Sequence, residues 1–190
     1  MVHAEIQWKD SPLEVSAEAR REGKLVLLFL FDPDCAGCQR MEKVTFAHPC
    51  VAEYIEHHFA PVRMNAAADV SLFERYNCFW TPTLIVQDSE AHECRRTEGF
   101  LPPECFVAEM ALARLKDALN RHQFERALEL APETRRHLEG DKYREPEGFY
   151  WSGVAEYKAS KNVEPLKNWW TRLLEEFPES EWAKRAEVIR

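Results

Sequence analysis

The residues with the clearest chemistry in this chain are two cysteines spaced three apart, in the segment Cys35-Ala36-Gly37-Cys38. A thiolate attacks a disulfide sulfur, and a second thiol one helical turn away is close enough to resolve the mixed disulfide that results. The spacing therefore predicts thiol–disulfide exchange, with Cys35 as the nucleophile and Cys38 as the resolving thiol.

The same spacing also supplies half of many zinc sites, so a metal site is the alternative. Its four ligands would be Cys35, Cys38, His48 and Cys50. The intervals between these residues are irregular compared with known zinc-binding spacings. We therefore expect neither a metal nor any other cofactor.

The cysteines fall between two predicted elements. Leu25–Phe31 is a run of seven apolar residues, which indicates a strand buried on both faces, and Gln39–Phe46 has helical periodicity. A helix N-terminus presents unpaired N–H groups and the positive end of the helix dipole, which stabilise a thiolate. Asp32 and Asp34 oppose this effect. We expect the helix to prevail and Cys35 to titrate below the ordinary thiol pKa of about 8.5.

This order of strand, C-x-x-C and helix, followed by Trp80-Thr81-Pro82-Thr83 before another apolar strand, resembles the thioredoxin superfamily. The similarity is strongest to its bacterial thioredoxin-like branch, and it covers roughly the first two-thirds of the chain. The residues that carry it are Cys35, Cys38, Met41, Thr45, Phe46, Val51, Glu53, Tyr54, Ile55, Phe59, Pro61, Val62 and Asn65.

The resemblance implies a substrate platform as well as a fold. In this family the proline before the strand is cis and faces the cysteines, so that the preceding residue offers its N–H and C=O to an extended substrate. Here those residues are Thr81 and Pro82, with Trp80 beside them. Without the resemblance, a proline at the start of a strand needs no functional explanation, because that position requires no ladder N–H.

Two positions depart from the pattern of the resembled thioredoxins. Phe29 stands where those proteins carry a buried acid that assists the resolving thiol, and Asp34 stands where they carry tryptophan. We expect slower resolution in consequence. The two residues between the cysteines, Ala36 and Gly37, do not indicate whether the protein oxidises or reduces its substrates.

The predicted elements form a thioredoxin-like α/β domain, 1–119, whose mixed sheet is flanked by helices. Ile6 and Trp8 are interpreted as a short edge strand. The remaining elements are helices at 12–23, 39–46, 50–58, 67–76 and 103–119, and strands at 25–31, 59–64, 83–87 and 92–97.

The tail, 120–190, has only helical patterns and is predicted to be a second, all-helical domain. Phe124, Ala127 and Pro132 match the spacing of a tetratricopeptide helix. A tail of this kind suggests an alternative function, in which an interaction protein docks a partner and has little redox turnover. We expect its aromatic residues to pack between helices: Tyr150, Trp151, Tyr157, Trp169, Trp170 and Trp182.

Composition and net charge limit the classes of molecule that this chain is expected to bind. The chain has 190 residues, 45% of them hydrophobic, and a net charge of −8, which argues against a broad nucleic-acid or anionic-membrane surface. Proteins or small molecules with thiols or disulfides are the expected partners. The N-terminus lacks a secretory pattern and no apolar run is long enough to span a membrane, so we expect a cytoplasmic protein. Its other cysteines are then free thiols: Cys50, Cys78, Cys94 and Cys105.

Overall fold

The structure is a computed structural model that describes residues 5–68 and 70–189. Outside this range lie residues 1–4, part of the stretch on which the expected lack of a secretory signal rests. Residue 69 of the predicted helix 67–76 and residue 190 of the predicted tail also lie outside it. Among the described residues, no helix has both the length and the apolar character needed to cross a membrane.

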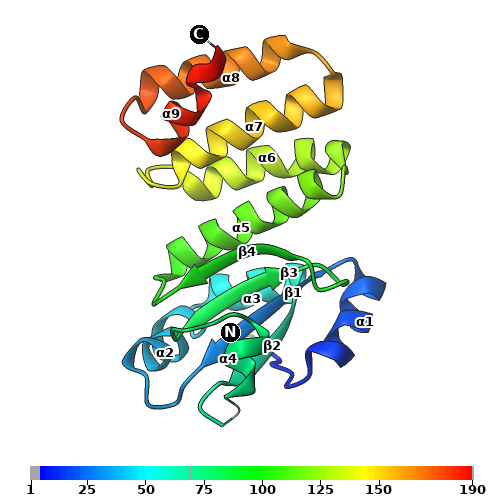
Figure 1. Cartoon of the computed structure of the whole chain (residues 1–190), viewed down its shortest axis with the longest axis vertical. Helices are drawn as coiled ribbons and strands as arrows, with labels where there is room; N and C mark the ends of the chain where they lie inside the picture. The colour runs from blue at the N-terminus through cyan, green and yellow to red at the C-terminus, as the bar shows by residue number, and fades with distance from the viewer. Residues whose placement is uncertain (1–4, 69, 190) are drawn as a thin grey trace. The chain divides into compact units, whose positions relative to one another are not determined.

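One mixed sheet of four strands forms the centre of the first unit, in the order β2-β1-β3-β4 (Figure 1). Strand β1, Leu25–Phe31, pairs in parallel with β2, Phe59–Asn65, and antiparallel with β3, Thr83–Gln87. Strand β4, Glu93–Glu98, closes a hairpin with β3. The predicted mixed sheet is confirmed, with Leu25–Phe31 in its interior.

The uninterrupted apolar run of β1 is explained by cover on both of its faces. On one face, Leu28 and its neighbours pack against α1, Pro12–Glu22, and α4, Ser71–Arg75. On the other face, Phe29 lies in a cluster of aromatic rings with centroids 5.0 to 5.8 Å apart: Trp8, Phe29, Phe31, Phe46 and Phe106. Leu28 and Phe29 are both fully buried.

The segment after the cysteines is two consecutive helical turns of different kinds. Helix α2 spans Ala36–Arg40, and a π-helical turn follows at Met41–Thr45, where the N–H of Phe46 donates to the carbonyl of Met41 at 2.8 Å. Leu101 anchors this turn, since its N–H donates to Met41 Sδ at 3.3 Å and its carbonyl accepts from the Thr45 hydroxyl. The predicted helix over 39–46 thus begins earlier and contains a π turn. Helix α3, Pro49–His58, follows.

The predicted edge strand at Ile6 and Trp8 is wrong. Lys9 alone bridges to β2, with its N–H on the Pro61 carbonyl at 3.0 Å and its carbonyl accepting from the Arg63 N–H at 2.8 Å. Proline has no N–H, so Pro61 cannot donate the next bond that would extend this ladder toward Ile6.

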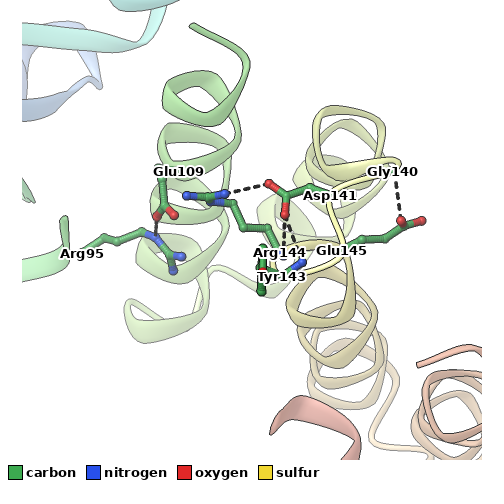
Figure 2. A network of polar contacts seen from close by, with 7 residues as sticks. All are labelled: Arg95, Glu109, Gly140, Asp141, Tyr143, Arg144 and Glu145. Carbon is green, nitrogen blue, oxygen red and sulfur yellow. Dashed lines mark hydrogen bonds and ion pairs between the residues drawn. The ribbon is translucent and has the colours of Figure 1, made fainter. Parts of the chain in front are cut away.

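Contacts divide the chain into two compact units, the first ending at Glu109 and the second beginning at Met110. The division falls inside α5, Pro103–Asn120, so the predicted domain boundary after Leu119 stays a prediction. Within the first unit, Arg95 of β4 forms a largely buried ion pair with Glu109 of α5 (Figure 2).

The second unit is helical, as predicted. Tyr150 stacks on Trp170 with centroids 4.5 Å apart and lies 5.1 Å from Trp182, so these three rings pack between helices, whereas the prediction is wrong for Tyr157, which is 37% exposed. Just before the helix that begins at Glu145, the Asp141 carboxylate accepts hydrogen bonds from the backbone and the side chain of Arg144 (Figure 2). The helices that follow α5 are α6, Phe124–Leu138; α7, Glu145–Ser160; α8, Val163–Glu176; and α9, Glu181–Ala186, with a 3-10 turn at Glu187–Ile189.

Leu28→Ala tests the central position of β1. Removing a fully buried leucine side chain should lower the free energy of unfolding by about 2–5 kcal/mol, through lost transfer energy and the cavity left behind. Urea unfolding followed by circular dichroism measures the change. The control is Leu13→Ala, because Leu13 is 82% exposed in α1 and its truncation should cost less than about 0.5 kcal/mol. Equal effects of the two variants would contradict the assigned core.

Candidate active site

The loop between β1 and α2 is held by its own backbone and by Asp32. The Asp32 carboxylate accepts the N–H of Asp34 at 2.8 Å, and its carbonyl accepts the N–H of Cys35 at 3.1 Å. Cys35 is then the N-cap residue of α2, in extended backbone conformation, with its side chain half-buried. The expected placement of the first cysteine at a strand-to-helix junction is confirmed.

The Cys35 thiol lies against the segment that precedes β3. Its Sγ donates to the carbonyl oxygen of Thr81 at 3.2 Å, and the Thr81–Pro82 peptide bond is cis. Gly37 also meets this segment, because a Cβ on Gly37 would lie 2.9 Å from Pro82 Cδ. The structure therefore brings Cys35, Thr81 and Pro82 together. Sequence reasoning missed the part of Gly37, although a glycine between the two cysteines was a visible signal of close approach.

The two cysteines have different environments and opposite pKa shifts. Burial raises the pKa of Cys35, but hydrogen bonds from the Thr81 side chain and from the backbone N–H groups of Cys38 and Gly37 outweigh it, so the pKa lies below its ordinary value. Burial raises the pKa of Cys38 to about 11, and the adjacent Cys35 side chain adds to that rise. One thiol is thus activated while the other stays protonated.

Phe29, which stands where the resembled thioredoxins carry a buried acid, has aromatic neighbours. Phe29 is fully buried, and its ring lies 5.0 Å from Phe46 and 5.5 Å from Phe31. Cys38 itself is only 2% exposed. A carboxylate at position 29 would have no polar partner among these rings, so deprotonation of Cys38 gets no help from this residue.

Trp80 is exposed, and its backbone is firmly held. Its carbonyl accepts hydrogen bonds from the Thr83 hydroxyl at 2.8 Å and from Cys78 Sγ at 3.0 Å. Both donors are buried, so Cys78 is a structural thiol beneath this loop. Phe79, which sequence reasoning did not single out, is 79% exposed next to Trp80. An aromatic pair directly before Thr-Pro was the signal that would have found it.

The alternative metal site does not form in the part of the chain that is described. Cys50 Sγ and His48 Nδ1 are 2.9 Å apart at the start of α3. However, no three histidine, cysteine or acidic side chains converge there as a metal site would require. Cys35 and Cys38 are both thiols in this structure, with no disulfide between them.

Comparison with known proteins agrees with this geometry, since the profile of a thioredoxin-like domain matches residues 14–114. The chain belongs to the thioredoxin-like domain family. The match covers more than half of the sequence and includes both cysteines and Thr81–Pro82.

Relatives with this domain include thiol:disulfide interchange proteins named DsbD. That of Cronobacter sakazakii is 34% identical over 99 residues, which are 50% of this chain and 17% of that protein. That of Citrobacter koseri is 32% identical over 99 residues, with the same shares. The chain thus spans only about a sixth of the length of these relatives.

A solved structure shows the same fold. A thioredoxin from Thermus thermophilus superposes with a TM-score of 0.54 at 23% identity, and the superposition covers 61% of this chain and 93% of that one. The thioredoxin-like fold expected from the sequence is therefore confirmed for the first unit.

Thr81→Val tests what activates the first thiol. Valine keeps the shape of threonine but lacks the hydroxyl, so the pKa of Cys35 should rise and its alkylation by iodoacetamide near neutral pH should slow. Mass spectrometry of each cysteine across a pH series measures the midpoint. Thr97→Val is the matched control, because the buried Thr97 hydroxyl has no hydrogen-bond partner among the described residues. If the pKa of Cys35 is unchanged in Thr81→Val, the Thr81 hydroxyl does not stabilise the Cys35 thiolate.

Proposed function

We propose that this protein is a thiol–disulfide oxidoreductase that acts through Cys35 and Cys38. The observation that carries the proposal is the split between the two thiols: Cys35 has a lowered pKa beside the Thr81 carbonyl, whereas burial raises that of Cys38 to about 11. Thiol exchange begins with attack by an accessible thiolate, and a second thiol nearby can then resolve the mixed disulfide. The family and the names of its DsbD relatives support the same reaction class.

The reaction runs in two exchanges. The Cys35 thiolate attacks one sulfur of the substrate disulfide; a Cys35–substrate bond forms, the substrate S–S bond breaks, and the departing thiolate takes up a proton. Cys38 then loses its proton and attacks Cys35 Sγ, which releases the second substrate thiol. The substrate gains two electrons and two protons, and the protein retains a Cys35–Cys38 disulfide. The reverse sequence oxidises a substrate dithiol.

The backbone of Thr81 is the proposed guide for the substrate chain. Its carbonyl already lies 3.2 Å from Cys35 Sγ, so an extended segment paired with Thr81 would present its cysteine to the nucleophile. Trp80 and Pro82 border the same place. We propose protein or small-molecule disulfides as substrates and the cytoplasm as the compartment, where the buried Cys78 thiol that donates to the Trp80 carbonyl would stay reduced.

Trapping tests the roles of the two cysteines. Cys38→Ser should accumulate mixed disulfides at Cys35, because the resolving step is lost, whereas Cys35→Ser should accumulate far fewer, because the protonated Cys38 is a poor nucleophile. Non-reducing electrophoresis with peptide mapping identifies the linked residue. Cys105→Ser should behave as the unchanged protein does. Equal trapping by the Cys35 and Cys38 variants would refute the assignment.

A second proposed function is the binding of a partner protein by the helical unit. It is favoured by a groove of about 630 Å³ that lies along the connection between α8 and α9. Aromatic and acidic side chains line it, among them Tyr143, which is 72% exposed, Phe177 and Trp182. Exposed aromatic surface of this kind is typical of protein interfaces. The tetratricopeptide likeness of the tail is part of this proposal.

Tyr143→Ser tests the second function. It is made in the 190-residue chain that already carries Cys35→Ser and Cys38→Ser, so that neither of these thiols can hold a partner covalently. Partners that the groove holds should be retained by the double cysteine variant and lost, by about tenfold or more, when Tyr143 is also changed. Quantitative mass spectrometry of captured proteins measures the loss. Val188→Ser is the control, since Val188 is 80% exposed and does not line the groove. Retention by Tyr143→Ser would exclude this groove as the docking site.

A further inference from the structure

Two exposed aromatic side chains stand beside the reactive thiol. Phe79 is 79% exposed and Trp80 is 59% exposed, and they directly precede Thr81, whose carbonyl contacts Cys35 Sγ. Consecutive Cα atoms are 3.8 Å apart, so both aromatic residues begin within about 8 Å of the Thr81 Cα. Large apolar side chains left in water at such a place are typical of a contact surface.

The pair is presented on a fixed backbone. The Trp80 carbonyl is held by the buried Cys78 thiol and Thr83 hydroxyl, and the N–H of Gly99 donates to the Pro82 carbonyl at 2.8 Å. Aromatic side chains on a held backbone lose little conformational freedom when they bind, so a contact there retains more of its binding energy. The apolar surface is thus continuous with Thr81, the residue proposed to guide the substrate.

The charge around the thiol is negative. Asp32 and Asp34 lie within three residues of Cys35, and the unit that ends at Glu109 carries the whole net charge of −8. Arg40 is the cation of this stretch, and its guanidinium stacks on Phe100 with 4.6 Å to the ring centroid. Asp34 adjoins Cys35 in the chain, and an exposed charge acts over about 8 Å, one Debye length, at physiological salt. Cationic groups are attracted there and anionic groups are repelled.

We propose that this site selects disulfides within polypeptide segments that carry a bulky apolar residue and a basic residue next to the reactive cysteine. The apolar residue packs on Phe79 and Trp80, and the basic residue is drawn to Asp32 and Asp34. Anionic small disulfides, such as glutathione disulfide, react poorly. This inference rests on the proposed exchange reaction and assigns its substrate class.

Four peptide disulfides separate the two features. Each is the symmetric disulfide of a capped tripeptide with leucine or serine before the cysteine and lysine or glutamate after it. The reduced protein is mixed with each peptide, and the second-order rate of peptide thiol release is measured by chromatography, with glutathione disulfide as a fifth substrate. The leucine–lysine peptide should react about tenfold or more faster than the serine–glutamate peptide and glutathione disulfide. Added salt should shrink the lysine preference and leave the leucine preference.

Single variants assign each preference to its residues. Phe79→Ser should reduce the leucine-to-serine rate ratio by at least about threefold and leave the lysine-to-glutamate ratio unchanged. Asp34→Asn should do the opposite, since the Asp34 side chain is exposed and its backbone bond to Asp32 is kept. The controls are Leu13→Ser, which removes an apolar side chain that is 82% exposed, and Glu56→Gln, which removes an exposed carboxylate elsewhere on the surface. Both should keep the rates of the unchanged protein.

The outcomes separate this inference from the proposed function. If either ratio stays the same in its own variant, or if glutathione disulfide reacts as fast as the leucine–lysine peptide, the substrate class is wrong while the exchange reaction stands. If the unchanged protein reduces none of the five disulfides faster than Cys35→Ser does, the proposed function itself fails. If Phe79→Ser abolishes both the leucine preference and the lysine preference, the inference is also overturned. That result would show that the substitution disturbed the whole loop and did not remove a distinct apolar contact.

Discussion

The contact between the Cys35 thiol and the Thr81 carbonyl joins residues 46 positions apart and sets the geometry of the site. It exists because β1 and β3 are adjacent and antiparallel, so that the end of one strand meets the start of the other. It also requires Gly37, since any larger residue there would press on Pro82. The chemistry of the first cysteine is therefore a property of the sheet order as much as of the C-x-x-C segment.

Two thiols in one helical turn become different reagents through their surroundings alone. Cys35 receives several hydrogen bonds at the edge of the protein, and these stabilise its charged form more than burial destabilises it. Cys38 points into a region where burial dominates. Phe29, at the position where the resembled thioredoxins carry an acid, packs against the rings of Phe31 and Phe46 and supplies no carboxylate. In the proposed exchange reaction, these surroundings would favour attack by Cys35 and would make the proton of Cys38 hard to remove.

The sequence was informative where a structure depends on local composition. The apolar runs predicted as strands match the observed β1 and β3. Both strands are buried on both faces, so the apolar residues within each follow one another and do not alternate with polar residues. The edge strand at Ile6 failed because its ladder depends on a partner, and Pro61 lies far away in the chain. The aromatic pair before Thr81–Pro82 was visible in the sequence, but the exposure of Phe79 was not, since whether an aromatic residue packs or faces water is decided by elements it does not adjoin.

The π turn at Met41–Thr45 has a consequence for helical phase. One extra residue in a turn rotates everything after it by about 100° relative to a continuous α-helix. Phe46 lies just beyond this rotation and contacts Phe29 and Phe106, whereas Cys35 lies before it and contacts the Thr81 carbonyl. One helical segment therefore contacts both the loop before β3, through Cys35, and the aromatic core, through Phe46, and the π turn lies between these two contacts.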